Sequence, residues 1–283
     1  MATLTRPWRI IDLINWGTDR FAEKGASNAR REMEWFLCDV LDCQRIDLYI
    51  KFENLLYEND LIKLRQIVQR RLSGEPFQHI LGKGSFYSRD FRVDNNVLIP
   101  RPETELIIER LKARGKVNSL LDVGTGTGCI AITAALEKLA ENIFATDSSV
   151  LALSVAKQNM KIFNVTNIKM ALHNFLHSRF KSKFDVVVSN PPYISVDDMS
   201  FLQKEVKDYD PSSALTDNAD GLSFYRRFAE QFDNLLISGG VLLLEFAGNG
   251  QKDDIEKIFN GTGLKTEFFK DLQKKWRVVE VYR

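Results

Sequence analysis

The chain makes a sharp turn at Leu121-Asp122-Val123-Gly124-Thr125-Gly126-Thr127-Gly128-Cys129-Ile130, between a short apolar run and the start of a helical pattern. Glycines in such a turn permit positive φ angles and let a ligand approach the backbone closely. A glycine-rich turn is weak evidence by itself, because dinucleotide-binding proteins share it.

The spacing of the glycines and two neighbouring acids narrow the class of ligand. The turn has the form Gly-x-Gly-x-Gly, whereas dinucleotide-binding folds use Gly-x-Gly-x-x-Gly. Asp122 directly precedes the turn, and a carboxylate there suits the ammonium group of a sulfonium amino acid better than a pyrophosphate. Asp147 ends the next expected strand, where an acid accepts hydrogen bonds from ribose hydroxyls in such folds. These features together predict an adenosyl ligand without phosphate.

Each acid also has a plainer interpretation. Asp147 is suited to cap the helix that follows it, with Ser148 and Ser149 as competing caps. Asp122 would then be an ordinary turn residue at the end of a strand. The ligand-binding interpretation is favoured because both acids occur together with the glycine turn.

From Pro102 onward, extended and helical segments alternate. Pro102 suits the first position of a helix, and acids follow it. Repeated units of this kind predict an α/β domain with a parallel sheet covered by helices on both faces. The expected strands are 118–123, 143–146, 168–172, 184–189, 241–246, 264–270 and 276–282. The expected helices are 103–114, one that begins near residue 128, one that follows the second strand and ends near residue 164, 221–237 and 250–260.

The first 75 residues have a different pattern. Apolar residues recur at helical spacing, as in Ile10, Leu13 and Ile14, and predict four or five short helices in a bundle. Residues 1–74 carry 12 Lys/Arg and 11 Asp/Glu, a net 12 − 11 = +1, so the bundle is not a polybasic nucleic-acid arm. A role in binding or positioning a protein is favoured, and plain packing against the main domain is the alternative.

A helix-breaking stretch, Ser73-Gly74-Glu75-Pro76, follows the bundle. Residues 80–99 are rich in β-type side chains, interrupted by the turn signal Asp94-Asn95-Asn96. We therefore expect a β-hairpin linker. The expected division is a helical domain at 1–75, the linker at 76–101 and the α/β domain at 102–283.

A second motif, Asn190-Pro191-Pro192-Tyr193, follows the expected strand 184–189. Its prolines fix the loop beyond the carboxyl end of the strand, where ligands bind in open α/β sheets. An amide or adenine NH2 is a poor nucleophile because its lone pair is delocalised. The Asn190 oxygen and the Pro191 carbonyl can accept both N–H bonds and orient the lone pair toward a methyl donor. Tyr193 can stack on a flat substrate group, and the plainer interpretation of the motif is a simple turn.

The remaining features limit the function. A net charge of +1, from 39 Lys+Arg and 38 Asp+Glu, does not favour a DNA-coating protein. The longest apolar runs fall short of the ~18 residues of a membrane span, and the first residues lack a signal-peptide core, so a cytoplasmic protein is expected. No metal site is expected, because the cysteines and histidines lack metal-ligand spacing. These residues are Cys38, Cys43, Cys129, His79, His173 and His177.

The chain resembles the HemK/PrmC family, the release factor glutamine methyltransferases, over nearly its whole length. The glycine turn and Asn190–Tyr193 match the family position for position. Residues 81–93 look like the family's linker hairpin, and residues 205–215, 220–222 and 225–226 also look familial. The family's signature segment is similar to Val97-Leu98-Ile99-Pro100-Arg101-Pro102-Glu103-Thr104-Glu105.

The resemblance implies a class I S-adenosylmethionine-dependent methyltransferase with a Rossmann-like sheet, which methylates the side-chain nitrogen N5 of a glutamine. In the family, this glutamine lies in the Gly-Gly-Gln loop of peptide chain release factors. The resemblance implies cofactor contacts at Gly124–Gly128, Asp147 and Asn190, and glutamine contacts at Asn190–Tyr193. It also implies that the helical bundle helps to hold the release factor. We expect a monomer without a stable nucleic-acid partner or membrane association.

One position departs from the family. After the third strand the family often has an acid followed by a large aromatic residue near the adenine, and here that place reads Asn174-Phe175. Phe175 can still stack on adenine. Asn174 lacks the charge but keeps an amide that can form hydrogen bonds, so its contact with adenine is less certain than the ribose contact of Asp147.

Three other functions fit parts of the pattern. A sibling enzyme that methylates a ribosomal-protein glutamine would share fold and motif. A DNA adenine-N6 methyltransferase would use the same Asn190–Tyr193 chemistry, but it must flip a base and grip phosphates, and no clustered basic recognition segment is present. A non-catalytic binding module is disfavoured by the intact glycine turn, Asp147 and Asn190.

Overall fold

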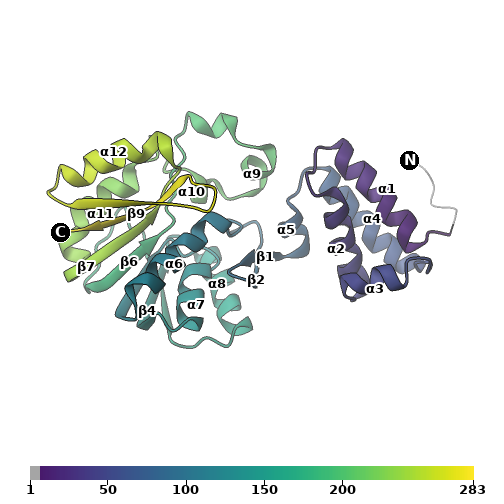
Figure 1. The fold of residues 1–283 in the computed structure, drawn as a ribbon, viewed down its shortest axis with the longest axis horizontal. Helices are drawn as coiled ribbons and strands as arrows, with labels where there is room; N and C mark the ends of the chain where they lie inside the picture. Colours follow the sequence, from purple (N-terminus) through teal and green to yellow (C-terminus); the bar gives the residue numbers. More distant parts are fainter. Residues whose placement is uncertain (1–6) are drawn as a thin grey trace. The chain divides into compact units, whose positions relative to one another are not determined.

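The computed structural model describes residues 7–283 and divides between Gly82 and Lys83 into two compact units, which are described separately (Figure 1). Within residues 7–82 the first unit has five α-helices. The apolar faces of these helices meet in one core, in which Phe21 lies edge-on to Phe36 with ring centroids 5.9 Å apart. The helices are α1 (Ile10–Glu23), α2 (Ala29–Leu41), α3 (Arg45–Ile50), α4 (Glu58–Leu72) and α5 (Phe77–Leu81). The expected helical bundle is therefore confirmed.

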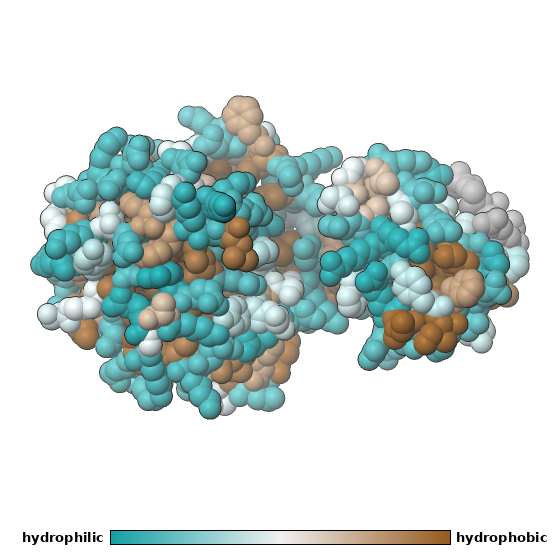
Figure 2. Space-filling view, viewed as in Figure 1, coloured by the Kyte–Doolittle hydropathy of each residue, from teal (hydrophilic) through white to brown (hydrophobic). Residues whose placement is uncertain are grey.

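Large apolar side chains are exposed along α3 and the segment that follows it. Figure 2 shows brown side chains gathered over this part of the bundle. Ile50 is 71% exposed and Tyr57 81%, so these side chains add little to the core. Exposed apolar patches of this kind mark contact surfaces for other molecules. We call this surface the apolar patch, and its residues are Ile46, Tyr49, Ile50, Phe52, Leu55 and Tyr57.

The second unit is built on a seven-stranded sheet with the order β5-β4-β3-β6-β7-β9-β8 (Figure 1). Because β4 and β6 pair with opposite edges of β3, the strand order reverses there and leaves a crevice at the carboxyl ends of these strands. The strands are β3 (Val117–Val123), β4 (Ala140–Asp147), β5 (Ile168–Leu172), β6 (Phe184–Ser189), β7 (Leu236–Glu245), β8 (Lys265–Lys270) and β9 (Trp276–Tyr282).

Helices cover both faces of this sheet, as the alternating pattern predicts. One face carries α6 (Glu105–Arg114), α7 (Cys129–Leu136) and α8 (Val150–Ile162), and the other carries α11 (Ser223–Leu235) and α12 (Asn249–Asn260). Successive residues of the central strands alternate between two apolar cores: Leu120 of β3 lies in the first and Leu121 in the second. Burial on both faces explains why these strands are continuous apolar runs.

The sheet is mixed, which corrects the expectation of a parallel sheet. Strand β9 runs antiparallel to both β7 and β8. The reason is local: a short turn joins β8 directly to β9, and a parallel pair needs a crossover of a dozen or more residues. The sequence predicts no helix or strand between β6 and α11, but this segment forms short helices. These are η2 (Asp198–Phe201), α9 (Lys204–Tyr209) and α10 (Ser212–Leu215).

The expected hairpin is present as β1 (Lys83–Phe86) and β2 (Arg89–Arg92). Its turn lies at Tyr87 and Ser88, whose φ angles are 51° and 58°, and not at residues 94–96. Tyr-Ser is not a usual sequence for left-handed turn residues, so the sequence carried no signal for this turn. The Phe91 ring packs 4.7 Å from the Phe163 ring, so the hairpin belongs to the core of the second unit. The expected domain boundaries at residues 75 and 101 stay predictions.

Of the helices described in residues 7–283, none combines the length and the apolar character needed to cross a membrane.

Candidate active site

The glycine turn leads from β3 into α7 at the carboxyl edge of the sheet. Gly124, Gly126 and Gly128 all have positive φ, at 73°, 53° and 81°. A Cβ atom on Gly128 would lie 2.9 Å from Ile132 Cδ1, so this glycine allows α7 and α8 to pack beneath the turn. A Cβ atom on Gly124 or Gly126 would meet nothing within 4 Å. At these two positions the requirement is therefore the left-handed backbone conformation.

Asp122 lies beneath the turn and does not line the cavity above it. The Thr125 hydroxyl donates to Asp122 Oδ2 at 2.7 Å, while Oδ1 is buried without a hydrogen-bond partner among the described residues. Burial raises the pKa of Asp122 to about 7. The structure thus gives Asp122 a role in shaping the turn, and its expected contact with an ammonium group stays a prediction.

Asp147 ends β4 and lines the cavity, as its place in the sequence indicates. Its Oδ2 accepts a hydrogen bond from Gly126 N at 2.9 Å, and its Oδ1 accepts one from Ser149 N at 2.9 Å. Burial raises the pKa of this carboxyl. Ser149 is the cap of α8, because its hydroxyl accepts from Ala152 N at 3.1 Å. The carboxylate lines the cavity, so its remaining lone pairs can accept from a ligand hydroxyl.

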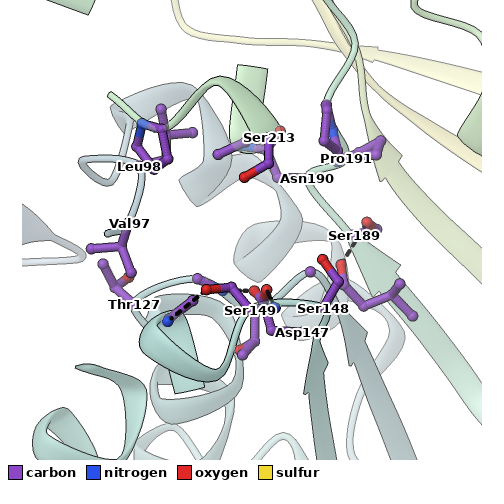
Figure 3. Close-up of a pocket in the computed structure, with 18 of the residues that line it drawn as sticks. Val97, Leu98, Thr127, Asp147, Ser148, Ser149, Ser189, Asn190, Pro191 and Ser213 are labelled. Atoms are coloured by element: carbon purple, nitrogen blue, oxygen red, sulfur yellow. Dashed lines mark hydrogen bonds between the residues drawn. The ribbon is translucent and has the colours of Figure 1, made fainter. Parts of the chain in front are cut away.

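Asn190, Pro191 and Pro192 follow β6 and line the same cavity. Figure 3 shows Asn190 and Pro191 across the cavity from Asp147. The end of β6 is tied to β3 by the Ser189 hydroxyl, which donates to Val123 O at 2.7 Å. The Asn190 side-chain nitrogen donates to Thr104 Oγ1 at 3.1 Å. Because the nitrogen is held in this way, the amide oxygen is the end of the Asn190 side chain that is available to a substrate.

Tyr193 is held by contacts behind the cavity. Its hydroxyl donates to Glu245 Oε1 at 3.4 Å, and its carbonyl accepts from Gln251 Nε2 at 2.7 Å. A Cβ atom on Gly221 would lie 2.3 Å from that carbonyl oxygen, and Gly221 has a φ of 78°. Burial raises the pKa of Tyr193 above its usual value. Tyr193 does not line the cavity, so its expected stacking on a substrate stays a prediction.

Asn174 and Phe175 line the cavity beyond β5. Phe175 is 4% exposed, and its ring lies 4.3 Å from that of Phe228 and stacks on Phe224. Such a wall offers a flat apolar surface to an aromatic ligand group.

Sequence reasoning missed a further part of the lining. The signature segment 97–105 was recognised, but no role in the cavity was assigned to its residues. His173 was dismissed because it lacked metal spacing. The missed residues include Val97, Leu98, Arg101, Thr104, Ser148, Ser149, His173, Ser213, Ala214 and Phe224.

The charge around the cavity does not favour a phosphate ligand. Among its lining residues in the described chain, Arg101 is the one permanently cationic side chain. Arg101 is paired with the buried Asp210 at 2.8 Å. A pyrophosphate would face Asp147 without a free cation to offset it.

Comparison with known proteins identifies the family. Residues 12–82 match the PrmC N-terminal domain, and residues 101–205 match the methyltransferase small domain. The release factor glutamine methyltransferase of Geobacter sulfurreducens is 38% identical over 260 residues, which cover 91% of this chain and 90% of that protein. The chain belongs to the release factor glutamine methyltransferase family.

A second relative agrees with this placement, and a solved structure shares the fold. The release factor glutamine methyltransferase of Chlorobaculum tepidum is 37% identical over 280 residues, covering 94% of this chain and 95% of that one. A methyltransferase structure from Pyrococcus furiosus matches the fold with a TM-score of 0.53 at 21% identity, over 77% of this chain and 96% of that chain. The protein is an S-adenosylmethionine-dependent methyltransferase, and the resemblance read from the sequence is confirmed.

The residues of the cavity fit this cofactor. Asp147 lines the cavity with a carboxylate that can accept from ribose hydroxyls, and Phe175 offers an apolar wall for adenine. The turn at Gly124–Gly128 brings backbone close to the ligand, and the lack of an unpaired cation suits a ligand without phosphate. When bound, S-adenosylmethionine supplies an electrophilic methyl group on a sulfonium.

Proposed function

We propose that this protein transfers a methyl group from S-adenosylmethionine to the side-chain amide nitrogen N5 of the glutamine in the Gly-Gly-Gln motif of peptide chain release factors. Family membership supports this assignment, because relatives that match almost the whole chain carry the name release factor glutamine methyltransferase. Among the features of the structure, the position of Asn190 at the carboxyl end of β6 supports the reaction most directly.

Asn190 and Pro191 are assigned to the substrate amide. The Asn190 oxygen and the Pro191 carbonyl accept the two N–H bonds of the glutamine NH2 group. Both acceptors sit in a loop that prolines make rigid, so their orientation is set before the substrate binds. Preorganised groups of this kind stabilise a transition state by several kcal/mol. One such group accelerates the reaction by about 10²- to 10³-fold. They draw electron density toward the nitrogen and point its lone pair at the methyl group.

The cofactor residues are assigned to positioning. Asp147 binds the ribose hydroxyls, Gly124–Gly128 holds the methionine part, and Asn174 and Phe175 border the adenine. Asp122 supports the turn from below through Thr125. No strong base is needed before attack, because the nitrogen becomes acidic only once it is methylated.

The first unit is assigned to the protein substrate. A release factor is a large partner, and the apolar patch offers an exposed surface of the type that protein interfaces bury. We further propose that the enzyme acts in the cytoplasm as a monomer and without a stable nucleic-acid partner. The near balance of 39 Lys+Arg and 38 Asp+Glu supports the last point.

The test is a methyl-transfer competition with tritiated S-adenosylmethionine. A release factor made without modification, ribosomes and adenine-rich duplex DNA are offered together and then separated. Label in the release factor is the expected result. Label in a ribosomal protein would favour the sibling enzyme, and label in DNA would favour adenine-N6 methylation. No label anywhere, with cofactor binding intact, would favour a binding module.

A further inference from the structure

The Asn190–Tyr193 loop is tied to two side chains from elsewhere in the fold. Thr104 ends the short helix η1 (Pro102–Thr104), and Glu245 ends β7. Thr104 Oγ1 accepts a hydrogen bond from the Asn190 side-chain nitrogen at 3.1 Å, and Glu245 Oε1 accepts one from the Tyr193 hydroxyl at 3.4 Å. Thr104 is 2% exposed and Glu245 1% exposed, so water does not compete for either group.

Glu245 and Thr104 also act on one another. Burial raises the pKa of Glu245 to about 7, and the neighbouring Thr104 hydroxyl opposes this rise, while Glu245 Oε2 has no hydrogen-bond partner among the described residues. Glu103 raises the same pKa, while Arg277 and Tyr193 lower it. The backbone at Glu245 is fixed as well, because the Tyr225 hydroxyl donates to Glu245 O at 2.6 Å.

The chemistry of a hydroxyl group determines which groups donate and which accept in these hydrogen bonds. A threonine hydroxyl has one proton to donate and lone pairs with which to accept. The Thr104 oxygen accepts from the Asn190 nitrogen at 3.1 Å, so its own proton points away from Asn190, and a negative charge on the neighbouring Glu245 favours that direction. The Asn190 amide must then turn its nitrogen toward Thr104, which leaves its oxygen for the substrate. The opposite amide orientation would place one acceptor against another.

We propose that Thr104 and Glu245 are positioning residues that set the orientation of the Asn190 amide for methyl transfer. The inference rests on the proposed function, because it concerns the oxygen that receives a glutamine N–H bond. Both residues act through the motif loop: Thr104 through Asn190, and Glu245 through Thr104 and Tyr193. Neither is assigned a contact with the reacting atoms.

The first test compares Thr104→Val with Thr104→Ser in the full-length enzyme. Thr104→Val keeps the shape but removes the hydroxyl, and we expect kcat to fall by about 10- to 100-fold because the amide is no longer fixed. The cofactor Kd should stay within about twofold, since ground-state binding does not use this contact. Thr104→Ser keeps the hydroxyl and should retain most of the rate.

The matched control is Thr133→Val. Thr133 is also buried, at 0% exposure, and its hydroxyl oxygen has no hydrogen-bond partner among the described residues. It lies on α7 and is not among the residues that line the cavity. This variant should keep the wild-type kcat, which separates a specific effect from the general effect of a buried Thr→Val change.

The second test follows kcat against pH at saturating cofactor for the wild type and Glu245→Gln. When pH falls through about 7, Glu245 takes up a proton and can donate toward Thr104. Thr104 is then no longer restricted to accepting from Asn190, and the amide loses its fixed orientation. The wild-type kcat should therefore fall as the pH drops below about 7. Glu245→Gln cannot titrate and should lack this fall.

The outcomes separate the inference from the proposed function. Wild-type kcat in Thr104→Val, or the same fall of kcat at low pH in Glu245→Gln, would overturn the inference and leave the proposed function standing. If Thr104→Val does not fold, as judged by its thermal melt, the pH profile of Glu245→Gln still decides. A wild-type enzyme that transfers no methyl group to a release factor refutes the proposed function, and the inference with it.

Discussion

Asp122 and Asp147 are both acids of the cofactor site, but they differ in what they can reach. Asp147 lines the cavity, while Asp122 lies below the glycine turn and holds Thr125. The sequence placed both next to the ligand, because position along the chain does not reveal which side of a loop a side chain takes. The structure therefore predicts different consequences for substitution of the two acids.

For Asp147→Ala we expect a weaker cofactor complex with little change in the chemical step. Hydrogen bonds to a carboxylate contribute about 1.5–3 kcal/mol, so the cofactor Kd should rise by roughly 10- to 100-fold. Isothermal titration calorimetry measures this directly. An unchanged Kd would refute the ribose assignment.

For Asp122→Asn we expect a change in the pH dependence of stability. The pKa of Asp122 is raised from 3.8 to about 7, so the folded state holds its proton over a range where the unfolded state has lost it. The free energy of unfolding contributed by this group therefore falls as pH rises from about 4 to about 7. Asn cannot titrate, so the variant should gain stability relative to the wild type across that range in urea unfolding. A difference that does not vary with pH would contradict the assigned pKa.

For Asn190→Ala we expect methyl transfer to be nearly abolished. Loss of one preorganised acceptor costs about 10²- to 10³-fold in kcat, while the cofactor Kd should change little. Single-turnover rates and a binding titration measure the two effects separately. Wild-type turnover in this variant would rule out the acceptor role.

At the scale of secondary-structure elements, the Asn190–Tyr193 loop depends on a glycine far away in the sequence. Gly221 lies just before α11 and leaves room for the Tyr193 carbonyl, which Gln251 then holds. The sequence marked residues 220–222 as familial and began the expected helix at residue 221, whereas α11 begins at Ser223. Because the contact joins segments on either side of the short helices α9 and α10, no local pattern predicts it.

For Gly221→Ala we expect lower stability and a lower kcat. The new Cβ atom would lie 2.3 Å from Tyr193 O, so the loop must shift, and the positive φ adds strain of about 1–3 kcal/mol. Gly115→Ala is the matched control, because Gly115 also has a positive φ, of 82°, but its Cβ atom would meet nothing within 4 Å. Stability losses should be shared by both variants, whereas the loss of kcat should appear only in Gly221→Ala. An equal loss of kcat in both would show that the Tyr193 contact does not matter.

The elements themselves were largely predictable, and the contacts between them were not. Strands β5 and β6 begin and end where the sequence predicts, although β5 is an edge strand of the sheet and β6 lies inside it. Strands β8 and β9 were predicted, but their antiparallel direction and the Tyr87–Ser88 turn were not, because strand direction and left-handed turns leave little trace in composition. Asp147 and Asn190 were located by their places at strand ends, whereas Thr104 reaches Asn190 across 86 positions of sequence.

At the scale of the whole molecule, two compact units divide the work that the proposed function requires. The second unit holds the whole cofactor cavity, since all of its lining residues lie between Asn96 and Phe224. The first unit has its own core and the apolar patch. Recognition of the release factor can therefore be weakened without a change in the chemistry.

For the double variant Ile46→Ser, Ile50→Ser we expect a higher KM for the release factor. Removal of two exposed apolar side chains from an interface costs on the order of 1–3 kcal/mol, or about 10- to 100-fold in KM. The cofactor Kd and the stability should be nearly unchanged, because both side chains are more than half exposed. Leu272→Ser, at a more exposed site in the second unit, is the control. An unchanged KM would remove the apolar patch from the proposed interface.

Tandem mass spectrometry of a release factor, before and after incubation with the enzyme and S-adenosylmethionine, tests the central claim most directly. The account predicts one added methyl group on the side-chain nitrogen of the Gly-Gly-Gln glutamine, present with the wild type and absent with Asn190→Ala. A methyl group on any other residue, or an unmodified release factor despite bound cofactor, would contradict it.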